Sequence, residues 1–146
     1  MNIFNKRKDG GESSPVDAYF LIEVKGLFTI ALLKFNKGQR EAFHTHAFNA
    51  WTWFLKGNMR ESRFNTTFST VYTRSIFPKF TSRYNNHRVI AEEDSWCITL
   101  RGPWQKTWTE HKQVTTRKGV RRFKVTTFGH GRNILGETYD YVFGNN

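Results

Sequence analysis

The chain has 146 residues, enough for one domain with a hydrophobic core, and its 14 Phe, 5 Trp and 5 Tyr favour β-strands. The formal net charge of +11 favours polyanionic partners, although a soluble protein with a basic solvated surface has the same balance. The lone Cys97 excludes an intrachain disulfide, no run reaches the ~18 apolar residues of a membrane helix, and the first residues lack the apolar region of a secretory signal. We therefore expect a cytoplasmic protein.

The N-terminal quarter is predicted to contain a polar arm and one pair of strands. Residues 1–17 are rich in charged residues, Gly and Ser, which predicts an arm that precedes the folded domain at residues 18–146. Two strands are expected over 19–24 and 27–35, joined by a turn at Lys25-Gly26.

The central stretch, residues 43–55, is apolar and aromatic, with glycines on both sides. A regular strand there would place His44 and His46 on the same face, because side chains alternate along a strand. The other face would carry Trp51, Trp53 and Leu55. Large exposed apolar patches usually mark interfaces, so we expect a homodimer that uses this face.

The rest of the chain consists of short segments rich in Thr, Val, Tyr and Phe, separated by turn signals. These segments predict strands over 59–64, 66–76, 87–90 and 95–100, with one or two more beyond residue 112. Many short strands at this spacing predict an all-β sandwich or barrel without long helices.

The two histidines of the central stretch are candidate metal ligands, and His87, at the start of a predicted strand, is the best third ligand. Neutral imidazole suits Zn, Fe, Cu or Ni, and three ligands on one side of an ion leave the open positions that a catalytic site needs. The alternative is that these residues are hydrogen-bonded polar groups at a barrel mouth that bind no metal.

The same stretch resembles the first motif of the cupin superfamily, in which Gly precedes His-x-His by five residues and Glu and a second Gly follow. The matching positions are Gly38, His44, His46 and Gly57. The chain departs from the motif at the Glu, because Ala50 and Trp51 occupy its two possible positions. Pro78 and His87 resemble the second cupin motif loosely.

The segments FHTHAFNAWTWFLKGNMRE, NNHRV and WCITLRGPWQKTW are similar to those of small cupin-like proteins of bacteriophages and bacteria, over roughly residues 28–111. The resemblance implies a single-domain cupin-type β-barrel, also called a double-stranded β-helix or jelly roll. Three histidines without a carboxylate resemble the sites of thiol dioxygenases in that superfamily, which bind ferrous iron.

Two hypotheses about function follow. The first is a mononuclear Fe(II)-dependent dioxygenase of a small molecule, in which Arg74, Arg83 and Arg88 bind an anionic substrate group unless they are ordinary surface arginines. The second is a non-enzymatic cupin barrel, a structural or binding module that contacts nucleic acid or a phage or host protein. For a phage protein, the location would be the host cytoplasm or the virion.

The segment 112–124 has six Lys or Arg and no acidic residue. A hairpin there would concentrate positive charge at its tip and could bind nucleic acid through phosphate contacts. Its candidate contacts are Arg117, Lys118, Arg121, Arg122 and Lys124. The alternative is that these cations protect an edge strand against sheet-to-sheet aggregation.

Overall fold

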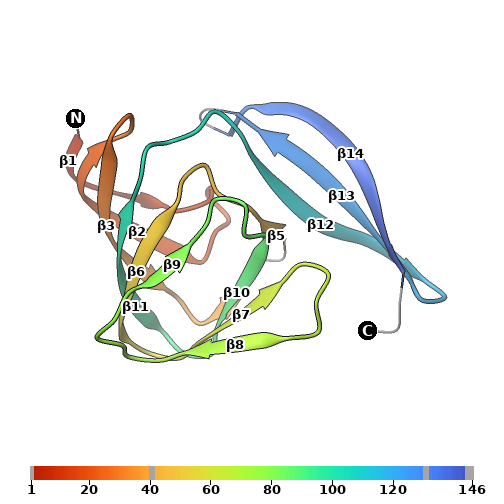
Figure 1. The fold of residues 1–146 in the computed structure, drawn as a ribbon, viewed down its shortest axis with the longest axis horizontal. Helices are drawn as coiled ribbons and strands as arrows, with labels where there is room; N and C mark the ends of the chain where they lie inside the picture. The colour runs from red at the N-terminus through yellow and green to blue at the C-terminus, as the bar shows by residue number, and fades with distance from the viewer. Residues whose placement is uncertain (1, 40–41, 130–131, 144–146) are drawn as a thin grey trace.

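The alternation of buried and exposed residues along the chain produces an all-β protein. The computed structural model describes residues 2–39, 42–129 and 132–143, and these contain fourteen strands and no α-helix (Figure 1). The strands are β1 (Asn2–Lys8), β2 (Val16–Val24), β3 (Phe28–Phe35), β4 (Gly38–Gln39), β5 (Phe43–His44), β6 (Ala50–Lys56), β7 (Met59–Arg63), β8 (Ser69–Tyr72), β9 (Lys79–Thr81), β10 (His87–Ala91), β11 (Ser95–Arg101), β12 (Trp108–Arg117), β13 (Val120–Phe128) and β14 (Ile134–Phe143).

The strands form two antiparallel sheets that enclose the core as a jelly-roll β-barrel. One sheet has the order β1-β2-β3-β11-β6-β9, and the other has the order β14-β13-β12-β5-β10-β7-β8, with β4 paired to β10. Phe20 and Cys97 of the first sheet pack with Met59 and Ala91 of the second, and all four are at most 3% exposed. Burial of these side chains joins the two sheets. The all-β prediction is confirmed.

The segment expected to be a polar arm contains a strand. Strand β1 pairs with β2 from Asn2 opposite Glu23 to Lys8 opposite Asp17, so it forms one edge of the six-stranded sheet. Its charges are matched by acidic side chains of β2: Arg7 binds Glu23, and Lys8 lies 2.7 Å from Asp17. The polar composition therefore reflects a charged edge strand, which is a common protection against sheet-to-sheet association.

The central stretch does not form one continuous strand, contrary to expectation. Strand β5 ends at His44, β6 begins at Ala50, and the residues between them cross from one sheet to the other. During the crossing, the amide of Thr45 donates to the carbonyl of Thr109, and the carbonyl of Asn49 accepts from the amide of Gly102. Bonds to two different sheets require a break in the strand.

Strand β6 nevertheless presents the expected residues on the outer face of its sheet. Trp51 and Leu55 are each 45% exposed, and Trp53 is partly buried. Trp51 lies opposite Phe80 of β9 on one side and Leu100 of β11 on the other. These residues belong to an apolar row that crosses all six strands of the sheet: Phe80, Trp51, Leu100, Ile30, Ile22 and Ile3.

Among the described residues, no helix is long and apolar enough to span a membrane.

Candidate metal centre

A cavity of about 430 Å³ lies inside the barrel, and the three predicted ligands line it. The even-numbered residues from His44 to Phe54 also line it, but so do Thr45 and Ala47, so the strict alternation of faces is lost in the break between β5 and β6. His87 is 6% exposed, and His44 and His46 are half-buried. The structure thus brings together side chains that are 43 positions apart in the sequence.

Backbone pairing places each histidine. His44 is the last residue of β5 and lies directly opposite His87, the first residue of β10. Thr45, between the two histidines of the motif, is fixed to β12 because its hydroxyl accepts a hydrogen bond of 2.9 Å from the amide of Thr109. The amide of His46 donates to the carbonyl of Arg83 over 3.0 Å. Both sides of the crossing segment are therefore held, which positions the two imidazoles without a regular strand.

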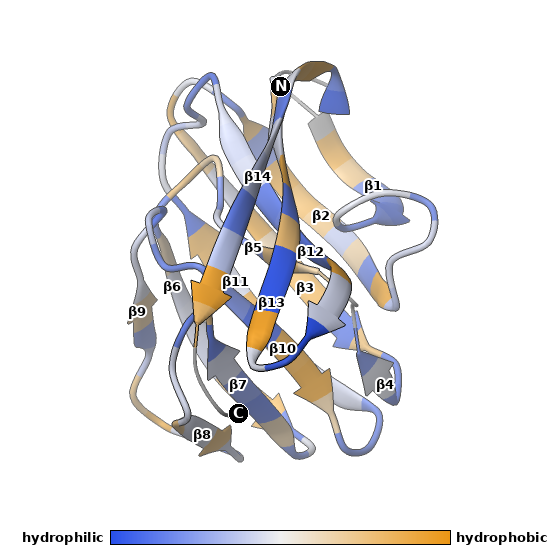
Figure 2. Cartoon of the chain, turned by 90° about the vertical axis from the view of Figure 1, so that its right-hand side faces the viewer, coloured by the Kyte–Doolittle hydropathy of each residue, from blue (hydrophilic) through white to orange (hydrophobic). Residues whose placement is uncertain are grey.

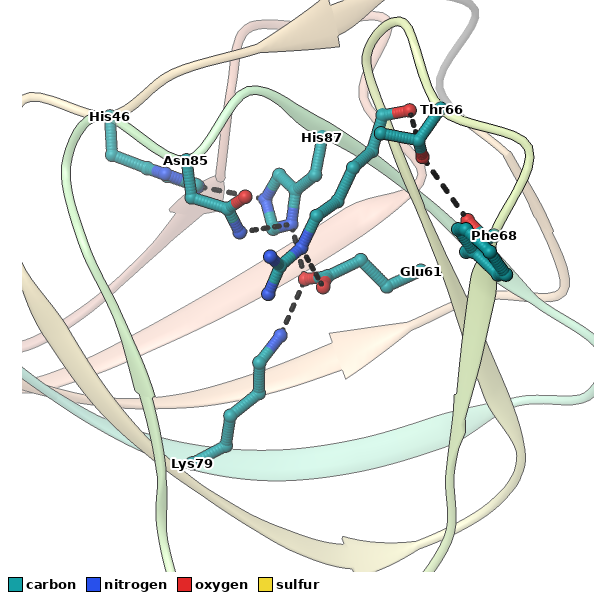
Figure 3. Close-up of polar contacts among 8 residues, drawn as sticks. His46, Glu61, Thr66, Phe68, Lys79, Asn85 and His87 are labelled. Carbon is teal, nitrogen blue, oxygen red and sulfur yellow. Dashed lines mark hydrogen bonds and ion pairs between the residues drawn. The ribbon is translucent and has the colours of Figure 1, made fainter.

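The spacing of the His46 and His87 imidazoles fits two ligands of one metal ion. One ring nitrogen from each of the three lies within 4.8 Å of the others, and Nε2 of His46 is 3.2 Å from Nε2 of His87. Two nitrogens bound at about 2.1 Å to one ion, with an angle of about 100° between them, are about 3.2 Å apart. Figure 3 shows the rings of His46 and His87 turned toward each other. These three histidines, which we call the histidine triad, could hold a divalent transition metal.

Glu61 of β7 orients the imidazole of His87 through a hydrogen bond to Nδ1. Its side chain is 2% exposed, and its Oε2 accepts a hydrogen bond of 2.5 Å from Nδ1 of His87 (Figure 3). Burial alone would raise the pKa of Glu61, but the hydrogen bonds from His87 and Lys79 outweigh it and lower the pKa to about 2. Glu61 is therefore ionised at neutral pH, and Nδ1 of His87 carries the proton. In the neutral imidazole, the lone pair of Nε2 is then directed at the metal position.

Lys79 of β9 compensates the charge of this buried carboxylate. Its Nζ lies 2.5 Å from Oε2 of Glu61 and 4.3 Å from the ring centroid of Tyr72. A buried carboxylate without a cationic partner would cost several kcal/mol. Neither Glu61 nor Lys79 is among the site residues predicted from the sequence. The triad of possible ligands contains neither, so Glu61 acts on the metal position through His87.

The substitution Glu61→Gln is expected to weaken metal binding by about 10- to 100-fold, the usual effect of removing a carboxylate that orients a metal-binding histidine. Gln has nearly the same shape as Glu, so any loss of metal affinity reports the loss of the carboxylate charge and of the orientation that it gives to His87. The matched control is Glu92→Gln, which removes an exposed ion pair with Arg60 at 2.6 Å. Competition with a chromophoric chelator would measure both affinities. Equal affinities in the two variants would refute the role given to Glu61.

Aromatic side chains form part of the cavity wall. Phe48 lies between the histidine triad and other residues of the wall. The centroid of its ring is 5.7 Å from the ring centroid of His46, 5.1 Å from that of Trp104 and 4.5 Å from the guanidinium of Arg101. Arg101 is 3% exposed and binds both carboxylate oxygens of Asp9, at 3.2 and 2.6 Å. Such walls exclude water and suit a ligand with an apolar body.

Five of the six Lys and Arg side chains that line the cavity are paired with acids, and the sixth, Lys25, lies 5.2 Å from the ring centroid of Trp104. The five pairs are Arg7 with Glu23, Lys8 with Asp17, Lys79 with Glu61, Arg101 with Asp9 and Arg132 with Glu110. The cavity therefore gives little support to an anionic substrate anchored by unpaired arginines.

The three arginines predicted to bind substrate lie outside the cavity. Arg74 is exposed, Arg83 donates to the carbonyl of Thr107 over 3.3 Å, and the guanidinium of Arg88 stacks 4.6 Å from the ring of Phe43. His87 points into the barrel, so its neighbour Arg88 points to the other face of β10. The structure does not bring these arginines to the histidine triad, and their assignment to the cavity is corrected.

Cys97 also borders the cavity but is not a reactive thiol. It is 1% exposed in the core, and burial raises its pKa to about 12. A thiol with such a pKa carries almost no thiolate at neutral pH. Cys97 therefore acts as a small buried hydrophobe.

The five cations proposed to bind nucleic acid lie on β12, β13 and their turn, separate from the histidine triad. None of them lines the cavity. They lie instead on the part of the eight-stranded sheet that extends away from the barrel in Figure 1.

Comparison with solved structures identifies the class of fold. An RmlC-like cupin from Shewanella frigidimarina superposes with a TM-score of 0.52 and 15% identity, covering 68% of this chain and 84% of that one. A cupin-superfamily sugar phosphate isomerase from Silicibacter pomeroyi gives 0.55 and 8%, covering 96% and 88%. The Fe(II) form of HppE gives 0.53 and 13%, covering 66% and 55%.

No family model and no curated protein sequence matches the chain. The structural likeness establishes the fold, so the protein is a cupin-type β-barrel, as the histidine motif implied. At 8–15% sequence identity, the structural similarity does not indicate the activity of this protein. The features of this chain that bear on function are the histidine triad and its cavity.

Proposed function

We propose that the protein is a mononuclear metal enzyme that binds Fe(II) at the histidine triad and acts on a small molecule with an apolar body. The observation that carries this proposal is the convergence of three imidazole nitrogens within 4.8 Å, beside a cavity of about 430 Å³ whose wall includes aromatic side chains. A structural metal site is normally closed by a fourth protein ligand. Here the ligand group of the described residues contains three histidines, which leaves positions for exogenous ligands.

Iron is the preferred metal because three neutral histidines resemble the ferrous sites of thiol dioxygenases. When bound, Fe(II) would supply redox chemistry with dioxygen, and the reaction class would be an oxygenation. The chain's own contributions are defined by its contacts. Glu61 holds the proton on Nδ1 of His87, and Phe48 and Trp104 shield the site from water.

Nitric oxide, a probe for open positions on ferrous iron, tests this proposal. Metal-free protein would be loaded anaerobically with one equivalent of Fe(II), exposed to nitric oxide and examined by electron paramagnetic resonance. We expect a protein-bound iron–nitrosyl signal at one iron per chain, which is lost in His46→Ala. A wild-type protein that gives no such signal, or that gives the same signal as His46→Ala, would overturn the proposal.

We further propose that two copies associate through the outer face of the six-stranded sheet, where Trp51 lies between Phe80 and Leu100. Trp51→Glu is expected to weaken the dimer by about 30-fold or more, because central Trp residues of interfaces often contribute at least about 2 kcal/mol. The control is Phe68→Glu, which charges an 83% exposed residue outside this face. Light scattering over a concentration series would measure association. A wild-type monomer at all concentrations would refute the dimer.

A further inference from the structure

The outer part of β12, β13 and β14 forms a three-stranded extension of the barrel. We call residues 112–124 and 137–143 the wing. Figure 1 shows these strands running away from the barrel, with the β12–β13 turn at their outer end. Residues 112–118 of β12 and its turn are exposed, and so is most of β14. Apart from the buried Phe123 and Val142, the wing contributes little to the core, and the chemistry of its exposed surface needs another explanation.

A hollow of about 410 Å³ at the outer end of the wing has a strongly basic lining. Its lining residues are Thr115, Arg117, Lys118, Val120, Arg122 and Tyr141. Three of the six are cations and none is acidic. Within the described part of the chain, the ion pairs include none with Arg117, Lys118 or Arg122. Unlike most of the cations that line the cavity, these three have no acidic partner among the described residues.

Two tyrosines accompany these cations on the same face. Tyr141 of β14 lies opposite Arg122 of β13, and Tyr139 lies opposite Lys124. The guanidinium of Arg122 stacks 3.9 Å from the ring centroid of Tyr139. Tyr139 and Tyr141 are 50% and 52% exposed, so their rings are accessible to a ligand. Figure 2 shows the wing strands at the front of the molecule, uncovered by other elements.

We propose that this face of the wing binds single-stranded nucleic acid, with Arg117, Lys118 and Arg122 on phosphates and Tyr141 stacked on a base. Grooves that bind single strands without sequence preference combine backbone-tracking cations with aromatic side chains. A duplex would offer its phosphates but not the faces of its bases. The accessible tyrosine rings therefore favour single strands, DNA or RNA, over a duplex.

The alternation of β13 provides a matched pair of variants. Arg122 lines the hollow, whereas the guanidinium of its neighbour Arg121 lies 5.8 Å from the ring centroid of Phe123 on the other face. Phe123 is 1% exposed and packs against Phe43 and Phe64. The substitutions Arg121→Gln and Arg122→Gln remove the same charge from adjacent positions, and only Arg122→Gln alters the hollow.

Fluorescence anisotropy with oligothymidylate, oligouridylate and a DNA duplex, each of about 12 nucleotides or base pairs, tests the proposal at salt concentrations between about 50 and 200 mM. Wild type is expected to bind both single strands more tightly than the duplex. Arg122→Gln is expected to weaken binding and to reduce the salt slope by about 0.7, the value for one lost phosphate contact on a single strand. Arg121→Gln is expected to keep most of the affinity and the slope.

Tyr141→Leu is expected to weaken binding to single strands by about fivefold or more, the effect of losing one stacked base, and Tyr141→Phe is expected to retain it. Circular dichroism would establish that each variant is folded. Equal affinities of Arg121→Gln and Arg122→Gln would overturn the proposal. The proposal would also be overturned if wild type bound the duplex more tightly than the single strands. It would likewise be overturned if Tyr141→Leu did not change the affinity for single strands. Metal content at the histidine triad is expected to be the same in every wing variant, because the two sites share no lining residue.

Discussion

His46→Ala is expected to lower the affinity of the protein for a divalent transition metal by more than about 100-fold, because removal of a ligand should exceed the effect of removing the carboxylate that orients one. His46 suits this test because it is half-buried and lies on a segment held by backbone hydrogen bonds. His87 suits it less, since its removal would leave Glu61, at 2% exposure, without one of its donors. Titration of metal-free protein with Co(II), followed by its visible absorption, would give the affinities.

The control for this variant is His111→Ala, which removes an imidazole outside the cavity. His111 packs 4.5 Å from the ring centroid of Phe64, and burial lowers its pKa. We expect His111→Ala to bind metal as wild type does. If the two alanine variants bind metal equally well, then the histidine triad is not the site of binding.

The substitution Gly57→Ala is expected to destabilise the fold by about 3 kcal/mol or more. Gly57, in the turn between β6 and β7, has φ of +108°, where an L side chain is strained. A Cβ there would also lie 2.6 Å from the Cα of Ser95 and 2.5 Å from its Cβ, so the backbone would have to shift. Urea unfolding of the metal-free proteins would measure the loss.

The matched control is Gly26→Ala. Gly26 lies in the exposed β2–β3 turn, and a Cβ added there would meet no atom within 4 Å. Its φ is outside the left-handed range, so alanine is tolerated. We expect a free energy of unfolding within about 0.5 kcal/mol of wild type, as for most surface substitutions. A loss at Gly57 no larger than the loss at Gly26 would contradict the account of this turn.

The strands could be predicted where alternation and turn signals agree. The segment 19–24 falls within β2, 87–90 falls within β10, and 27–35 covers β3 with one additional residue at its start. The break after His44 could not be predicted, because the change of sheet depends on partners such as Thr109 that are distant in the sequence. The strand within residues 1–17 was missed because a charged edge strand resembles a polar arm in composition.

The candidate site could be predicted in part. The spacing of His44 and His46 and the position of His87 nominated the three residues that the structure brings together. Glu61 had a usable signal, because it alternates with Met59 on the buried face of β7. Lys79 had none, since a lysine after a loop proline does not indicate which way it points. Arg88 could have been excluded from the sequence, because it follows His87 on a predicted strand and must point to the other face. Arg74 and Arg83 lie in loops, where no short pattern gives the side-chain direction.

The most direct test of the central claim is elemental analysis of the purified protein, expressed separately with iron, zinc, nickel and manganese. The account predicts close to one transition-metal ion per wild-type chain, with iron retained after anaerobic purification, and almost none in the His44→Ala and His46→Ala variants. Sub-stoichiometric content of all four metals in wild type, or the same content in wild type and both variants, would contradict it.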